Sequence, residues 1–386
     1  MSTQKKIPSP TNSGAFSYLL TIILAATAIF AVSYFALPAL FSVSYSEDSV
    51  SSSTSTPSKI KSLPPLDTRA YDEKLLALAH VAISSPWYTS FLAGTSTIAL
   101  PGATSSITVA KKSWPVRASY PADSRALLPF NRIVSYYGNF YSKNMGVLGQ
   151  YPTDVMLAML ASTTAQWRAA DPSTPVIPAI HYIAMVAQAD AGRDGKYRAQ
   201  MPDAEIDKAL ALAEQVHGIV FIDIQVGLSD LQTEVPKFEK YLKMPNVHLG
   251  VDPEFAMKTS GIKPGRVIGT LDATDINYTA QYLANLVRTY NLPPKVLMIH
   301  RFTGAMLTNS KKIKPLPEVQ IVVDMDGWGS PARKKNTYAH VVEAEPVQFA
   351  GFKLFYKNDL KEDPPRLLTP KEVLELTPAP SYIQYQ

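Results

Sequence analysis

The chain has 386 residues, of which 46% are hydrophobic and 18% are charged. A chain of this length and composition can bury one large core or two small ones. It contains no cysteine, which excludes disulfides, thiol nucleophiles, zinc–thiolate sites and a lipid-modified cysteine. The net charge of +5 is small for this length. Because lysine and arginine are scattered without long basic runs, no nucleic-acid partner is expected.

The first fifty residues predict a membrane anchor. Residues 15–41 carry no charged side chain over about 27 positions, whereas a membrane span needs roughly 20 residues and the apolar part of a signal peptide only about 7 to 15. Two lysines precede this stretch and two acids follow it, so we expect residues 1–14 in the cytoplasm and the rest outside. A signal peptide cleaved near Ser42–Ser46 is the alternative, and it also exports the protein.

Two segments separate the predicted anchor from the main domain. Residues 42–66 are rich in serine, threonine and proline and predict a linker that does not fold. Residues 67–131 begin with a possible amphipathic helix over Asp67–Ile83 and continue as an irregular stretch. We expect this second segment to pack on the outside of the domain formed by residues 132–386.

From Arg132 onward, apolar runs typical of buried strands alternate with helical patterns. The runs are Ile133–Tyr137, Val176–Ala187, Ile219–Gln225, Val247–Val251, Val267–Leu271, Val296–Phe302, Val319–Met325 and Phe349–Tyr356. Eight strands in this order predict an α/β fold of the (β/α)8 barrel type. An open doubly wound sheet is the alternative, and it is disfavoured because the first strand is not followed by a G-x-G-x-x-G phosphate loop.

Polar side chains stand at or near the carboxyl ends of these predicted strands, where barrel enzymes have their active sites. Asp223 and Gln225 end the third strand, Asp252 and Glu254 the fourth, His300 and Arg301 the sixth, Asp324 and Asp326 the seventh, and Lys353 lies in the eighth. Three of these pairs repeat at a spacing of two, so each pair projects to one side of its strand. We therefore expect Glu254, Asp326, Asp324, Asp252 and Asp223 to crowd one pocket as catalytic carboxyl groups.

Further side chains are predicted to bind substrate at the same mouth. Tyr136 near the end of the first strand and Trp328 just after the seventh offer flat apolar faces suited to sugar rings. Gln225, His300, Arg301 and Lys353 offer hydrogen bonds and charge.

These strand-end residues resemble those of the TIM-barrel glycoside hydrolases. The largest retaining clan of that group has an acid/base at the end of the fourth strand and a nucleophile at the end of the seventh, which the resemblance places at Glu254 and at Asp326 or Asp324. The clan has Asn-Glu and Glu at those ends, whereas this chain has Asp-Pro-Glu and Asp-Met-Asp. The resemblance implies hydrolysis of a glycosidic bond in a cell-envelope polymer or another carbohydrate, with no cofactor.

Other interpretations of the same residues stay open. Turn chemistry explains acids beside Pro253 or Gly327, and an ion pair with Lys353 or Arg301 explains Asp223. A divalent metal held by the acidic cluster, with His300 as a further ligand, is the rival mechanism. A barrel that binds glycans or proteins without turnover is the alternative outside enzymes. The chain lacks G-x-S-x-G and H-E-x-x-H, which argues against a serine hydrolase and a zinc hydrolase.

Overall fold

The computed structural model describes residues 63–99, 106–109 and 112–386. The predicted membrane helix at residues 15–41 lies outside these ranges, as does nearly all of the predicted linker. None of the helices within the described ranges combines the length and the apolar character needed to cross a membrane.

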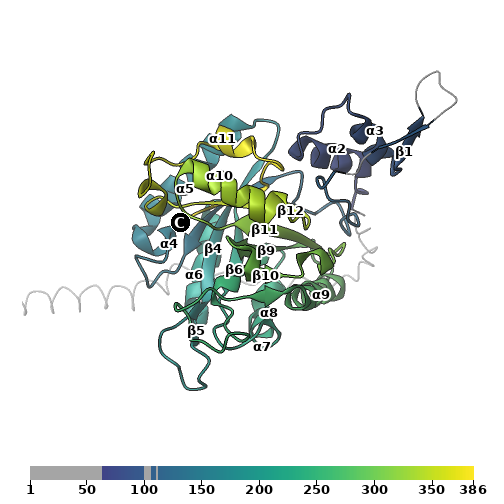
Figure 1. The fold of residues 1–386 in the computed structure, drawn as a ribbon. Coiled ribbons are helices and arrows are strands. Elements are labelled where there is room, and N and C mark those ends of the chain that lie inside the picture. The colour runs from purple at the N-terminus through teal and green to yellow at the C-terminus, as the bar shows by residue number, and fades with distance from the viewer. Residues whose placement is uncertain (1–62, 100–105, 110–111) are drawn as a thin grey trace, which may run out of the picture. The chain divides into compact units, whose positions relative to one another are not determined.

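Eight parallel strands form a closed barrel, which is a TIM-type fold (Figure 1). They are β3 (Arg132–Gly138), β4 (Val176–Ala187), β6 (Ile219–Ile224), β7 (Val247–Val251), β9 (Lys295–Arg301), β11 (Val319–Met325), β12 (Phe349–Leu354) and β13 (Tyr382–Tyr385). Each strand pairs with the next, and β13 pairs with β3, for example through Gln384 and Ser135. The ladder therefore has no open edge within the barrel.

Seven of the eight predicted strands lie in this wall, and the fifth prediction is wrong. Residues 267–270 are not a strand, and Val267 and Ile268 are 41% and 46% exposed. Only the two residues of β8 (Leu271–Asp272) pair, with β10 (Leu307–Thr308) outside the barrel. Because β7 pairs directly with β9, no place in the wall remains between them.

The strand that the sequence pattern missed is β13, which closes the barrel. The order after the fourth strand therefore shifts by one. The acids at the end of β11 come from the sixth strand, not the seventh, and Lys353 comes from the seventh, not the eighth. This corrects the expected match with the clan whose two carboxyl groups end strands four and seven.

Helical segments connect the strands, and several of them are short. The α-helices of this part are α4 (Val147–Gln150), α5 (Thr153–Ala170), α6 (Asp203–Gln215), α7 (Leu231–Glu234), α8 (Glu239–Leu242), α9 (Ala273–Tyr290), α10 (Pro331–Tyr338) and α11 (Pro370–Leu374). The 3-10 segments are η2 (Val235–Phe238), η3 (Pro253–Phe255), η4 (Gly304–Met306), η5 (Ser310–Lys312) and η7 (Asn358–Leu360), and η6 (Ala339–Glu343) is a π-helix. Asp272 caps the start of α9, because its side chain accepts from Thr274 N in a capping box.

A small N-terminal part precedes the barrel and contacts it. It comprises α2 (Thr68–Leu78), α3 (Pro86–Ala93) and an antiparallel pair formed by β1 (Thr97–Ala99) and β2 (Ser106–Thr108). Ala379 N donates to Leu78 O at 2.7 Å, and the indole of Trp114 donates to Glu343 O at 2.9 Å. These bonds attach the N-terminal part to segments beside β12 and β13.

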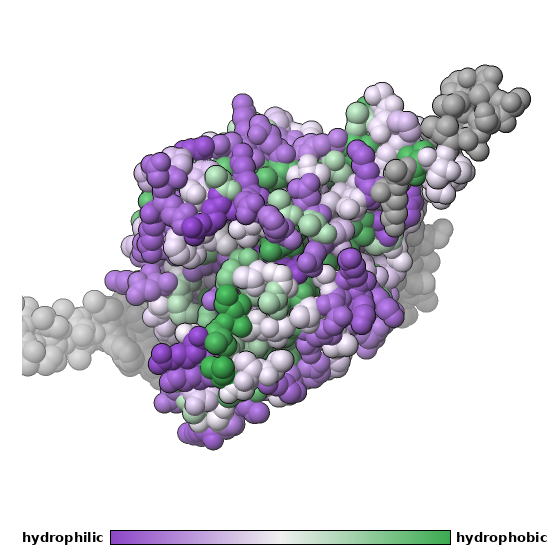
Figure 2. Space-filling model, viewed as in Figure 1, coloured by the Kyte–Doolittle hydropathy of each residue, from purple (hydrophilic) through white to green (hydrophobic). Residues whose placement is uncertain are grey.

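The surface in view is mainly polar. Figure 2 shows a largely hydrophilic face with one narrow band of hydrophobic residues below its centre. Single apolar side chains such as Ile83 and Tyr141 are 78% and 65% exposed, and scattered exposure of this kind is normal for folded domains. The hydrophobic side chains are mostly buried between the barrel wall and its helices, as Trp167 of α5 and Phe238 of η2 are.

A buried ion pair fixes the segments on one side of the barrel mouth. Lys334 of α10 lies with its Nζ 2.9 Å from Asp359 Oδ2, and both side chains are almost fully buried. Asp359 also accepts hydrogen bonds from Gly329 N at 3.0 Å and Phe355 N at 2.9 Å. One carboxylate therefore connects α10, the loop after β11 and the end of β12.

Replacing Asp359 by alanine should lower the free energy of unfolding by about 3–5 kcal/mol, because Lys334 would be left buried without its counter-charge. Urea denaturation followed by circular dichroism measures this loss. The matched control is Glu73→Ala, which breaks the exposed pair between Arg69 and Glu73 and should change stability far less. Equal stabilities of the two variants would contradict a stabilising role for the buried pair.

Candidate active site

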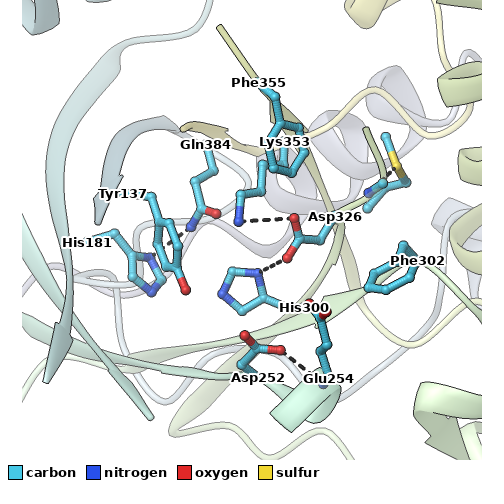
Figure 3. Close-up of polar contacts among 12 residues, drawn as sticks. Tyr137, His181, Asp252, Glu254, His300, Phe302, Asp326, Lys353, Phe355 and Gln384 are labelled. Carbon is cyan, nitrogen blue, oxygen red and sulfur yellow. Dashed lines mark hydrogen bonds and ion pairs between the residues drawn. The ribbon is translucent and has the colours of Figure 1, made fainter. Parts of the chain in front are cut away.

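A pocket of about 510 Å³ lies at the carboxyl ends of the barrel strands. Three carboxyl groups line it, those of Asp252, Glu254 and Asp326. Trp328, Phe302, Phe355 and Tyr137 supply its aromatic walls. Figure 3 shows most of these side chains directed toward a shared space. Carboxyl groups from two different strand ends are thus brought together with flat apolar surfaces.

The end of β7 places two of the carboxyl groups. Asp252 follows the strand directly, and its Oδ1 accepts from Glu254 N at 3.0 Å, which starts the short η3 turn at Pro253. The amide of Gln225 donates to Asp252 Oδ2 at 3.2 Å. Burial raises the pKa of Asp252 to about 8, and the charges of Glu254, Asp223 and Asp326 act in the same direction. Burial and the charge of Asp326 also raise the pKa of Glu254.

The third carboxyl group has two cationic partners. Asp326 follows β11, with Oδ1 3.0 Å from Lys353 Nζ and Oδ2 2.8 Å from His300 Nδ1. Burial alone would raise the pKa of Asp326, but Lys353 and His300 outweigh burial and hold this pKa below its ordinary value. The surroundings therefore stabilise the charged form of Asp326 and shift Asp252 and Glu254 toward the protonated form.

Below the pocket, the carboxylate of Asp223 lies among two histidines and a tyrosine. Asp223 Oδ1 lies 3.3 Å from His181 Nε2 and 3.4 Å from His300 Nε2, and its Oδ2 accepts from Tyr137 Oη at 3.0 Å. Burial alone would raise the pKa of Asp223, but the histidines hold it well below its usual range. Burial lowers the pKa of His181 to about 4. The pKa of His300 is raised, because Asp223 and Asp326 outweigh its burial.

Two glycines make room for these interior side chains. A Cβ on Gly250 would lie 2.4 Å from Asp223 Oδ1 and 2.5 Å from His181 Nε2. A Cβ on Gly351 would lie 2.5 Å from Asp324 Oδ1. Asp324 is fully buried below Asp326, and burial raises its pKa to about 7. Its two oxygens have no hydrogen-bond partner among the described residues.

The structure divides the predicted site residues into three groups. Lining the pocket are Asp252, Glu254, Asp326, Gln225, Trp328 and Lys353. Buried inside the barrel are Asp223, His300 and Asp324. Facing away from the pocket are Tyr136 and Arg301.

The two outward residues are held by structural contacts. Tyr136 Oη hydrogen-bonds with Thr163 and with Tyr356 between the wall and its outer layer. Arg301 donates to backbone carbonyls and pairs with Glu345 at 2.7 Å. Tyr136 precedes the inward Tyr137, and Arg301 follows the inward His300. Because side chains alternate along a strand, both point outward. Their position corrects the expectation that they bind substrate.

The partners expected for Asp223 also need correction. Neither Lys353 nor Arg301 pairs with it; the two histidines and Tyr137 do. Neither His181 nor Tyr137 is among the site residues predicted from the sequence. Gln384, whose amide lies 3.2 Å from His181 Nδ1, stands on the missed strand β13. Alternation groups Ser135 with Tyr137 and His181 with Ile183 on one face of each strand, but it does not tell which face points inward.

Comparisons with known proteins do not assign the chain to a family. No protein-family model and no curated protein matches the chain. Among solved structures, a GH5-4 broad-specificity endoglucanase from an uncultured bacterium matches with a TM-score of 0.29 and 8% identity, over 57% of this chain and 76% of that one. A GH18 chitinase from Pseudoalteromonas aurantia matches with a TM-score of 0.27 and 11% identity, over 66% and 79%. At these values neither likeness carries an argument about activity.

Replacing Gly250 by alanine should disturb the interior of the barrel, because the added methyl group would overlap Asp223 and His181. We expect a loss of about 1–3 kcal/mol in the free energy of unfolding, measured by urea denaturation. Gly304→Ala is the matched control, since a Cβ at Gly304 meets no atom within 4 Å. A Gly250→Ala protein as stable as the control would show that the interior has room to spare.

Proposed function

We propose that this chain is a carbohydrate-active enzyme that hydrolyses a glycosidic bond, with Glu254 and Asp326 as its two carboxyl groups. The observation that carries this proposal is that both side chains, which come from different strand ends, line the same pocket. Hydrolysis of a glycosidic bond requires one carboxyl group that gives a proton and one carboxylate that acts from the other side of the sugar.

The surroundings favour a division of roles. Glu254 is half-buried and makes no ion pair within the described part of the chain, so it is suited to hold a proton and give it to the leaving oxygen. Asp326 has Lys353 and His300 beside it, so it is suited to act as the anion. In this mechanism the proton of Glu254 passes to the glycosidic oxygen as its bond to the anomeric carbon breaks.

Asp326 can act in two ways, and both begin with the proton transfer from Glu254. If Asp326 attacks the anomeric carbon directly, it forms an ester, which water then cleaves while Glu254 takes back a proton. If water attacks instead, Asp326 takes the proton of that water. The separation of the two carboxyl groups decides between them, about 5–5.5 Å for the first and about 6.5–9.5 Å for the second.

The walls of the pocket support a sugar as the substrate. Trp328 is 44% exposed at the rim, and Phe302 and Phe355 line the same space. Flat apolar side chains beside a few polar groups are typical of sites that stack on sugar rings. Gln225 and Lys353 lie on the same lining and can hydrogen-bond to hydroxyl groups.

The proposal includes a location. Residues 15–41 would anchor the chain in a membrane with the barrel on the outer side, where envelope polymers are within reach, on the sequence grounds of length and flanking charge. The alternative function is a barrel that binds envelope glycans or proteins without turnover. The enzyme is favoured because two carboxyl groups that line the pocket have pKa values shifted in opposite directions, upward at Glu254 and downward at Asp326.

Replacing Glu254 by glutamine should lower hydrolysis by about 10²- to 10⁴-fold, because the amide cannot give a proton to the leaving group. The measurement is release of reducing ends from a panel of oligosaccharides by the full-length protein, with the melting temperature recorded alongside. Glu375→Gln, at an exposed acid outside the pocket, is the control and should keep full activity.

Two outcomes would contradict the proposal. Full activity of the Glu254→Gln protein would remove Glu254 from the mechanism. Binding of glycans by the wild-type protein without hydrolysis of any of them would favour the non-catalytic barrel.

A further inference from the structure

Three fully buried side chains direct donor atoms at one point inside the barrel. They are His181 of β4, Asp223 of β6 and His300 of β9. One ligand atom from each lies within 4.8 Å of the others. Their strands are neighbours or near neighbours in the wall, so the three donors are held by rigid elements and not by loops.

The spacing of these atoms is long for hydrogen bonds. Asp223 Oδ1 lies 3.3 Å from His181 Nε2 and 3.4 Å from His300 Nε2, whereas charge-assisted N–H···O bonds measure about 2.7–2.9 Å. None of the three atoms has a hydrogen-bond partner within the described ranges. Buried polar atoms without partners are costly and require an explanation.

The two separations between Asp223 and the histidines fit donors that share one metal ion. Imidazole nitrogen and carboxylate oxygen bind Zn²⁺ at about 2.0–2.2 Å. Two donors at about 2.1 Å from one ion, separated by angles between about 90° and 109°, lie about 3.0–3.4 Å apart. The two observed separations lie at the upper end of this range.

The other polar atom of each side chain lies close to a polar atom of the protein, as in metal sites where outer groups orient the ligands. His181 Nδ1 lies 2.6 Å from Tyr382 Oη, and His300 Nδ1 lies 2.8 Å from Asp326 Oδ2. Asp223 Oδ2 accepts from Tyr137 Oη at 3.0 Å. Both histidines are therefore held with Nε2 toward Asp223 Oδ1.

Gly250 and Tyr137 adjoin the three donor atoms. Gly250 presents no side chain to Asp223 and His181, where a Cβ would lie 2.4 and 2.5 Å from their donor atoms. Tyr137, which contacts Asp223, also lines the pocket above. Tyr137 therefore adjoins both the candidate ligand Asp223 and the pocket.

We propose that His181, Asp223 and His300 bind one divalent transition-metal ion inside the barrel. Two imidazoles and one carboxylate favour Zn²⁺, Fe²⁺ or a similar ion over Mg²⁺ or Ca²⁺, which prefer all-oxygen sites. The site differs from the acidic cluster considered from the sequence, because Asp252, Glu254 and Asp324 are not ligands. Bound there, the ion fixes His300 and, through it, Asp326. The proposal does not depend on glycoside hydrolysis.

The test uses Zn²⁺ as the probe. Full-length protein is stripped with a chelator, equilibrated with Zn²⁺, desalted and analysed by mass spectrometry for zinc per chain, and the affinity is measured by calorimetry. We expect about one zinc per chain for the wild type and at least a tenfold weaker affinity for His181→Gln and Asp223→Asn. The matched control is His248→Gln, since His248 is also buried in the barrel but accepts a hydrogen bond from Val296 N; it should keep its zinc.

Failure of the wild type to retain zinc would overturn the proposal, as would Asp223→Asn binding zinc as tightly as the wild type. If the variants do not fold, anomalous scattering from zinc-loaded crystals of the wild type decides. A peak within about 2.0–2.2 Å of the three donor atoms supports the site, whereas a peak elsewhere or none overturns it. Glu254→Gln should retain zinc, so a failure of hydrolysis and a failure of metal binding are distinguishable.

Discussion

The interior of the barrel buries several carboxyl groups, and His300 lies beside two of them, Asp223 and Asp326. Its Nδ1 lies 2.8 Å from Asp326 and its Nε2 3.4 Å from Asp223. Without a positive group at this position, two buried anions would face each other in a medium of low dielectric constant. The position of Asp326 at the pocket and that of Asp223 below the floor therefore both depend on one imidazole.

The carboxyl groups of the interior and the pocket fall into two kinds, according to whether a cationic side chain lies beside them. Asp326 and Asp223 lie beside histidine or lysine side chains, whereas Asp252, Glu254 and Asp324 make no ion pair among the described residues and are buried or half-buried. A proton donor and an anion can thus coexist a short distance apart in one pocket. This is the feature that links the interior of the barrel to the proposed chemistry at its mouth. A metal ion at His181, Asp223 and His300 would supply the same positive charge.

Much of the fold could be predicted from strand-like runs, and the exceptions have physical reasons. Val247–Val251 forms a strand with the predicted bounds, because a buried parallel strand is a short continuous apolar run. Val267–Leu271 has the same character, but pairing of β7 with β9 excludes it from the wall. The closing strand Tyr382–Tyr385 has four residues after a proline-rich stretch. Its pairing with β12 and β3 makes it a strand, and the local sequence does not predict this pairing.

The site was predictable in its location and in part in its residues. Strand ends with acids at a spacing of two indicated that Asp252, Glu254 and Asp326 would meet, and they line one pocket. Alternation along a strand does not reveal which of two neighbours faces inward. Tyr136 was therefore chosen where Tyr137 faces the pocket, and Arg301 was grouped with the inward His300. The miscounted strands placed Asp326 on the seventh strand, whereas it follows the sixth.

The central claim is that Glu254 and Asp326 act on opposite sides of one bound sugar. A crystal structure of the Glu254→Gln protein with an oligosaccharide that the wild type cleaves would test it most directly. The account predicts an anomeric carbon between residue 254 and Asp326, a ring stacked on the aromatic wall, and an oxygen-to-oxygen separation in one of the two ranges known for such pairs, about 5–5.5 Å or about 6.5–9.5 Å. A sugar bound away from this pocket, or a side chain at 254 turned toward the helices, would contradict it.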